Sequence, residues 1–377
     1  SPSSLPLPLF LLFHDFMIHS GLKMTLNCRI KGLLLGVAVG DSVGLPAEGI
    51  PRKRNHRMFK GKWHQRLCFG YGMISDDTEH SIFVSQCLLT SGDDEKIFIR
   101  RLAWCLKWWL ISLPAGVGLA TLKSIVRLWL GFSPLKSGVY SAGNGVAMRS
   151  SIIGAYFADN IDKLESFVTL STRITHSDPR ALIGARSIAL ITAWIVREDL
   201  QQCPDIDELE VMLRSIESED IEWLNLVNQI IYSLKQELSV IEFAELIGQK
   251  QGISGYIYHT VPIAIYAWYR HFDNFQEALE AVFNCGGDTD TTGAITGALC
   301  GVTLGKSAIP TSWIDKIAEY PRNIQLLEKI ADKLTENNPN YLKSSPINYN
   351  WWWILPRNIL FLIIVLMHGF RRLLPPF

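Results

Sequence analysis

Two short acidic segments carry the side chains best suited to chemistry. The first, Ser75 to Glu79, precedes an apolar-periodic run, and the second, Asp288 to Thr291, follows a pair of glycines. Each segment is typical of a helix N-terminus, where a single carboxylate is enough to cap free backbone N–H groups. Capping alone would make Asp76 the N-cap residue and Glu79 its capping-box partner.

The acids of these two segments exceed what capping requires. Adjacent carboxylates such as Asp76 and Asp77 repel each other unless a cation lies between them. Neither segment contains histidine or cysteine within Ser75 to Glu79 or Asp288 to Thr291, so the ligand chemistry favours hard ions such as Mg²⁺ or Mn²⁺. A calcium loop is excluded because Leu299 stands where the bidentate Glu is required.

Three further sites are weaker when taken alone. The small-residue segment 141–149 can direct backbone N–H groups at a phosphate, but it lacks the Gly-Lys-Ser/Thr of a P-loop, and Met148 replaces the third glycine of a dinucleotide fingerprint. His176 stands beside a helix start at Ser177 or Asp178 and is by default structural. Glu48 would by default be a solvated loop acid.

The elements that must position these side chains are helical. From Cys28 onward the sequence shows apolar-periodic segments of helical length with few strand-like runs, which predicts an all-α domain. Two segments carry glycine every fourth residue, at 32–44 and at 293–305. We expect these stripes to lie in the core, near each other. The predicted helices are 31–45, 77–91, 94–112, 145–157, 180–198, 206–217, 219–235, 240–248, 258–270, 274–283, 290–304 and 312–333.

Composition limits the classes of protein. The 377 residues are 48% hydrophobic, enough for a sizeable core, and the 36 basic and 36 acidic residues cancel. A nucleic-acid partner is therefore not expected. Seven scattered cysteines without a C-x-x-C pair favour a reduced, cytoplasmic protein.

Both ends differ from the domain predicted for 28–338. We expect residues 1–27 to be an N-terminal extension that is not native to the domain. The apolar tail 339–377 is expected to be a peripheral membrane anchor acting through 346–377. Trp351 to Trp353 would lie among lipid headgroups and Ile359 to Met367 in the bilayer. Three arginines would stay at the bilayer surface, namely Arg357, Arg371 and Arg372.

Four motifs in order resemble the ADP-ribosylglycohydrolase family, of the dinitrogenase-reductase-activating glycohydrolase type. The resemblance covers most of residues 30–305. The motifs are Gly36-x-Ala-x-Gly40-Asp41-x-x-Gly44-x-Pro46-x-Glu48, Ser75-Asp-Asp-Thr78, Gly143-Asn-Gly145-x-Ala-Met148-Arg149 and Gly286-Gly-Asp-Thr-Asp-Thr-Thr-Gly293.

The resemblance implies a single compact multi-helix domain with a central dimetal cleft, two Mg²⁺ or Mn²⁺ ions, and removal of ADP-ribose from a modified target. Asp77 and Asp290 would be catalytic, together with Glu48 as the mobile acid near the scissile bond. The metal ligands would be Ser75, Asp76, Asp77, Asp288, Asp290 and Thr291. The substrate would contact Ser141, Gly143, Asn144, Gly145 and His176.

The expected substrate is an ADP-ribosylated protein, with arginine favoured as acceptor, or a small ADP-ribose conjugate. Ala142 is small where some relatives place an aromatic against adenine, which leaves substrate choice open. Two other functions fit the same residues. One is a dimetal phosphohydrolase acting on a nucleotide, because such ions also activate water toward phosphorus. The other is a non-catalytic ADP-ribose-binding or structural protein.

Overall fold

The computed structural model describes residues 23–375, and all regular structure within that range is helical, as predicted. In chain order the α-helices are α1 (Leu26–Gly44), α2 (Arg52–Phe59), α3 (Asp76–Ser91), α4 (Glu95–Ile111), α5 (Leu119–Trp129), α6 (Ser151–Tyr156), α7 (Ile161–Arg173), α8 (Pro179–Arg197), α9 (Ile206–Ile216), α10 (Ile221–Lys235), α11 (Val240–Leu246), α12 (Ile257–Arg270), α13 (Phe275–Cys285), α14 (Thr289–Leu304), α15 (Thr311–Ile314), α16 (Ile324–Asn337) and α17 (Ile354–Arg371). Short 3₁₀ turns are η1 (Leu45–Ala47), η2 (Asn144–Arg149), η3 (Lys306–Ala308), η4 (Asn338–Asn340) and η5 (Trp351–Trp353).

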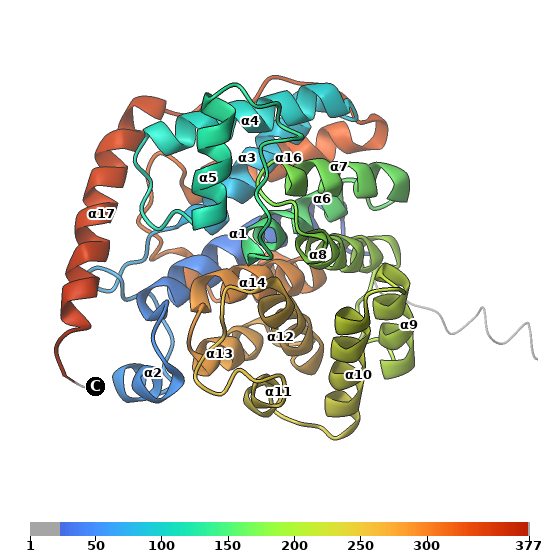
Figure 1. The fold of residues 1–377 in the computed structure, drawn as a ribbon, viewed down its shortest axis with the longest axis vertical. Coiled ribbons are helices and arrows are strands. Elements are labelled where there is room, and N and C mark those ends of the chain that lie inside the picture. Colours follow the sequence, from blue (N-terminus) through green and yellow to red (C-terminus); the bar gives the residue numbers. More distant parts are fainter. Residues whose placement is uncertain (1–22, 376–377) are drawn as a thin grey trace, which may run out of the picture.

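Helices α1 and α14 form the centre of the molecule and pack against each other along their glycine stripes (Figure 1). A Cβ atom placed on Gly36 would lie 2.0 Å from the carbonyl oxygen of Gly297, and one on Gly40 would lie 2.0 Å from that of Gly293. No side chain fits in such a gap, so glycine is needed for the two backbones to touch. The predicted burial and proximity of the stripes are confirmed.

The other helices wrap this central pair. Helices α8, α12 and α13 pack on α14, whereas α3 and α16 pack on α1. Because neighbours cover both partners, α1 and α14 carry mainly apolar and small residues on every side and are not amphipathic. The packing places the N-terminus of α14 close to that of α3, and both helices start at the acidic segments.

Two predicted helices are interrupted in the structure. The segment 145–157 is divided into η2 and α6, and 312–333 is broken into α15 and α16. The second break coincides with Pro321, which cannot continue a helix because it has no N–H and clashes with the preceding turn. Asp178, one of the two predicted starts, caps α8, and Pro179 is the first residue of the helix.

The C-terminal helix α17 lies along one side of the domain (Figure 1). Arg357, predicted at a bilayer surface, is instead 9% exposed and pairs with Glu319 at 2.6 Å. The expectation for Arg357 was therefore wrong, because the buried carboxylate of Glu319 neutralises its charge within the protein.

Candidate active site

The two acidic segments meet at the N-termini of α3 and α14. Thr291 Oγ1 donates to Asp77 Oδ2 at 3.3 Å, and Ser75 Oγ donates to the same oxygen at 3.4 Å. Residues more than 200 positions apart in the sequence thus share one carboxylate. The contact follows from the glycine-mediated approach of α1 and α14, which fixes the start of α14.

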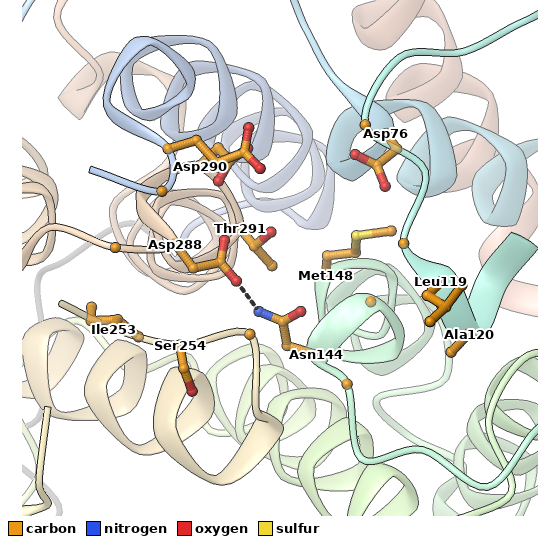
Figure 2. Close-up of a pocket in the computed structure, with 18 of the residues that line it drawn as sticks. Asp76, Leu119, Ala120, Asn144, Met148, Ile253, Ser254, Asp288, Asp290 and Thr291 are labelled. Carbon is orange, nitrogen blue, oxygen red and sulfur yellow. Dashed lines mark hydrogen bonds between the residues drawn. The ribbon is translucent and has the colours of Figure 1, made fainter. Parts of the chain in front are cut away.

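The start of α3 differs in detail from the capping-box expectation. Ser75, not Asp76, is the N-cap residue, and its side chain accepts from the Asp77 backbone N–H. Glu79 is turned into the protein, where it pairs with Arg322 and accepts from Trp109 Nε1 at 2.6 Å. Asp76 is therefore not needed for capping, and its carboxylate points into the pocket (Figure 2).

Asp41 is a site residue that sequence reasoning did not select. It lies near the end of α1, fully buried, and its Oδ2 accepts from Ser75 N at 2.8 Å, Thr78 N at 3.2 Å and Thr78 Oγ1 at 2.5 Å. Burial raises the pKa of Asp41 to about 6. A charged residue inside an otherwise apolar, glycine-striped helix was the signal that could have identified it.

Several buried carboxylate oxygens have no partner within residues 23–375. Oδ1 of Asp41, Asp77 and Asp290 are such atoms. Burial, followed by the charges of neighbouring acids, raises the pKa of Asp77 and of Asp290 well above the usual value. Unpaired buried acids crowded together are costly, and a cation among them would remove that cost.

The acidic side chains lie around the pocket but do not converge on one common point. In the described part of the chain, no three His, Cys, Asp or Glu side chains converge as a preformed metal site. Mg²⁺ commonly takes only one or two protein carboxylates and keeps several waters, and hydroxyls such as those of Ser75 and Thr291 add neutral oxygen ligands. The donor set and the unpartnered oxygens therefore fit hard divalent ions.

The 141–145 loop lies across the pocket from α3 and is tied to α14. Asn144 Nδ2 donates to Asp288 Oδ2 at 2.7 Å (Figure 2) and to Thr260 Oγ1 at 3.0 Å. His176 lies against the loop, since a Cβ on Gly143 would be 3.1 Å from its Nε2. Burial, followed by the charge of Arg149, lowers the pKa of His176 to about 3, so its imidazole is neutral at physiological pH.

Arg149 holds this loop from below and was not among the predicted site residues. Its guanidinium donates to Gly145 O at 3.1 Å, Ser171 O at 2.7 Å and Thr175 Oγ1 at 2.7 Å. Thr175 in turn contacts His176 Nδ1 at 2.9 Å. A fully buried arginine therefore fixes both the loop backbone and the neighbouring histidine.

The site contains one pocket of about 640 Å³, a size suited to a nucleotide-sized ligand. Figure 2 shows Asp76 on one side and Asp288, Asp290 and Thr291 on the other. Ser75 and Asp77 lie behind this lining, linked to it through Thr291. The predicted residues that line the pocket are Glu48, Asp76, Ser141, Gly143, Asn144, Gly145, His176, Asp288, Asp290 and Thr291.

Glu48 lies at the rim, just after η1, with its side chain exposed. The surrounding protein atoms and then the charge of Asp288 raise its pKa, while Arg372 opposes that shift. The geometry thus combines acids that can hold cations, a loop that can hold phosphates, and an acid at the rim that can carry a proton.

Comparison with known proteins agrees with this site. Residues 22–341 match the ADP-ribosylglycohydrolase family, and the chain belongs to that family. An uncharacterized protein from Archaeoglobus fulgidus is 30% identical over 322 residues, which covers 84% of this chain and 98% of that protein.

Named relatives are more distant. The ADP-ribosyl-[dinitrogen reductase] glycohydrolase of Rhodospirillum rubrum is 26% identical, over 77% of this chain and 90% of that protein. The ADP-ribosylarginine hydrolase Tri1 of Serratia proteamaculans is 21% identical, over 80% and 78%. A solved structure of an ADP-ribosylglycohydrolase-related protein complex has a TM-score of 0.58 at 24% identity and covers 82% of this chain and 98% of that one. This last likeness shows the fold.

Proposed function

We propose that the protein is a divalent-metal-dependent hydrolase that releases ADP-ribose from a modified target, with ADP-ribosylated arginine as the first substrate to test. The observation that carries the proposal is the shared carboxylate of Asp77, which joins the two acidic segments beneath the pocket. The names of two relatives, a glycohydrolase of ADP-ribosyl-[dinitrogen reductase] and an ADP-ribosylarginine hydrolase, support the substrate class.

The chain's own groups have separate tasks in this proposal. Ser75, Asp76 and Asp77 would hold ions from α3, and Asp288, Asp290 and Thr291 would hold them from α14. Bound Mg²⁺ or Mn²⁺ would neutralise the crowded acids and act as a Lewis acid that orients the ribose oxygens. The 141–145 loop, held by Arg149, would bind the diphosphate through backbone N–H groups.

Bond cleavage then depends on charge and proton placement. Glu48, whose pKa is raised by its surroundings and by Asp288, can hold a proton and deliver it to the leaving nitrogen. Departure of the acceptor leaves an oxocarbenium-like ribose, and carboxylates at the pocket that are not neutralised by an ion, Glu48 among them once it has given up its proton, stabilise it. Attack by water completes the hydrolysis. A neutral His176 can pack on the ligand without repelling a cation.

The test is product analysis with three substrates: a peptide ADP-ribosylated on arginine, one ADP-ribosylated on serine, and free ADP-ribose. Each is incubated with the protein in Mg²⁺, in EDTA, and after Mg²⁺ is restored. We expect ADP-ribose release from the arginine peptide, loss in EDTA and recovery with Mg²⁺. The Asp290→Asn variant is expected to be inactive, and Asp207→Asn, a surface change on α9, is the matched control.

The products distinguish the competing functions. Formation of AMP with any of these substrates would favour a nucleotide phosphohydrolase. Release only from the serine peptide would change the acceptor but not the reaction. No product from any substrate, with tight ADP-ribose binding retained, would favour a non-catalytic binding protein.

A further inference from the structure

Helix α17 binds the domain through buried polar side chains as well as through three apolar ones, Ile354, Phe361 and Ile364. Arg357 forms a two-point ion pair with Glu319, Nε to Oε1 at 2.8 Å and Nη2 to Oε2 at 2.6 Å. Asn358 Nδ2 donates to Ser112 O at 2.7 Å, and His368 contacts the backbone oxygen of Leu67. Surface helices normally direct such groups to water and their apolar residues to the core. Here polar groups lie among the buried side chains, and many apolar side chains face outward.

The opposite side of α17, together with η5, is an apolar surface that we call the outer face. Its members are 40–70% exposed: Trp351, Trp352, Trp353, Leu355, Ile359, Leu360, Leu362, Ile363, Leu366, Met367 and Phe370. Three helical segments within residues 23–375 are long and apolar enough to cross a membrane. The two in the domain are 94% and 61% buried over their most apolar windows, but 351–371 is only 28% buried.

A turn beside α17 extends the outer face. Cys68 and Tyr71 form a tight pair, Cys68 N to Tyr71 O at 3.0 Å, and the turn presents Phe69 with its side chain 98% exposed. Leu67, at the base of the turn, packs with Phe361 and Ile364 of α17. An apolar area of this extent, built from several elements, marks an interaction surface.

Two stretches of the chain at the outer face carry charge of one sign. No acidic residue occurs between Glu48 and Asp76, a stretch that includes the basic helix α2, and none follows Glu336. Helix α2 lies next to the C-terminal end of α17 (Figure 1), where Arg54 binds the backbone oxygen of Arg372. Lys53 on α2 is exposed, as are Lys60 and Lys62 just after it. The apolar face is thus bordered by basic residues in a chain whose total charge is zero.

We propose that the outer face lies on the surface of a bilayer that contains anionic lipid. The apolar side chains would enter the acyl boundary, Trp351 to Trp353 would lie at the headgroups, and the basic residues would meet lipid phosphates. A spanning helix does not fit, because the Arg357 to Glu319 pair and the Asn358 contact hold one side of α17 on the domain. The polar underside is what keeps the helix parallel to the domain surface.

The test is co-sedimentation of the full chain with phosphatidylcholine vesicles that contain or lack phosphatidylglycerol. The proposal expects binding to the anionic vesicles, weaker binding to pure phosphatidylcholine, and a decrease with added salt. Leu360→Glu/Met367→Glu changes two exposed positions of the outer face and is expected to lower vesicle binding at least about tenfold. Lys53→Glu/Lys62→Glu is expected to lower binding to anionic vesicles by about fivefold per residue and to leave the weak binding to phosphatidylcholine unchanged.

The matched control is Val211→Glu/Ile221→Glu, at apolar positions on α9 and α10 that are 70% and 75% exposed. These helices lie on the side of the molecule away from α17 (Figure 1), so this control should bind as the unaltered protein does. Equal loss in the control, or wild-type binding by Leu360→Glu/Met367→Glu, would overturn the proposal. So would a protein that ignores vesicles but changes from dimer to monomer with Leu360→Glu/Met367→Glu, since a second copy would then cover the face. Hydrolase activity on a soluble substrate is measured in parallel, and its failure would leave the vesicle result unaffected.

Discussion

Replacing Asp77 by asparagine should stabilise the metal-free protein and destabilise it relative to wild type when Mg²⁺ is present. Asp77 is 1% exposed, its Oδ1 has no partner among the described residues, and its Oδ2 receives only two long hydroxyl contacts. Asparagine has the same shape and no charge. Leaving a buried polar group unsatisfied costs about 1–3 kcal/mol, and more if the group is charged, so the free energy of unfolding should rise by about 1–3 kcal/mol.

The corresponding temperature shift follows from chain length. With an unfolding entropy of about 2.1 cal/mol/K per residue over 377 residues, each kcal/mol changes Tm by roughly 1.3 °C. The variant should therefore melt about 1–4 °C higher in EDTA. An ion at 100 times its Kd adds about 2.7 kcal/mol to the protein that binds it, so wild type should gain roughly 3.5 °C in Mg²⁺ and the variant much less.

The assay is thermal unfolding followed by intrinsic fluorescence, in EDTA and across a Mg²⁺ series, with urea unfolding at 25 °C as a second measure. Asp207→Asn, on the exposed surface of α9, serves as control and should shift neither curve. A crossing of the wild-type and Asp77→Asn stabilities as Mg²⁺ rises is the expected result. An Asp77→Asn protein that is less stable in EDTA, with an unchanged Mg²⁺ response, would refute the reasoning.

Three further outcomes are expected. Gly297→Ala should lower the free energy of unfolding by about 1–3 kcal/mol or more, because its Cβ would lie 2.1 Å from Gly36 O. The measurement is urea unfolding. Gly248→Ala is the control for backbone strain without overpacking, since Gly248 has a positive φ but a Cβ there would meet no atom within 4 Å. Glu48→Gln should lower kcat about 10²-fold or more in single-turnover assays while calorimetry shows an unchanged Kd for ADP-ribose. His176 has a pKa of about 3 in the folded protein and about 6.5 in the unfolded chain, so below pH 6.5 it binds a proton only on unfolding. The free energy of unfolding should therefore fall as the pH drops below 6.5. His176→Gln should make the dependence of that free energy on pH less steep between pH 6 and 4.5, by about 1.4 kcal/mol per pH unit, as measured by urea titrations.

The features that could be predicted from the sequence were those that depend on residue type and local spacing. Glycine every fourth residue along 32–44 and 293–305 has few explanations other than close backbone contact, and the contact of α1 with α14 confirms it. Surplus acids at two helix starts were likewise visible as residue types. Their meeting at Asp77 follows from the α1 and α14 contact, which brings the two helix starts together.

Other features depend on partners distant in the sequence and could not be predicted. Glu79 has the spacing of a capping residue, but Arg322, more than 240 positions away, draws it inward. Arg357 appears as a break in an apolar tail until Glu319 is placed beneath it. The local sequence shows which residue types occur and how they are spaced along a helix. Which partner neutralises a charged side chain depends on tertiary packing. Asp41 differs from these, because its charge inside an apolar, glycine-striped helix was visible in the sequence, and only its three donors at the start of α3 depend on tertiary packing.

The most direct test of ion binding between the two acidic segments is an anomalous difference map from crystals grown with Mn²⁺. We predict two peaks in the pocket, flanked by the 75–77 residues on one side and by the 288–291 residues on the other, both lost in Asp290→Asn crystals. A map without peaks there, from protein that still releases ADP-ribose, would contradict a two-ion site.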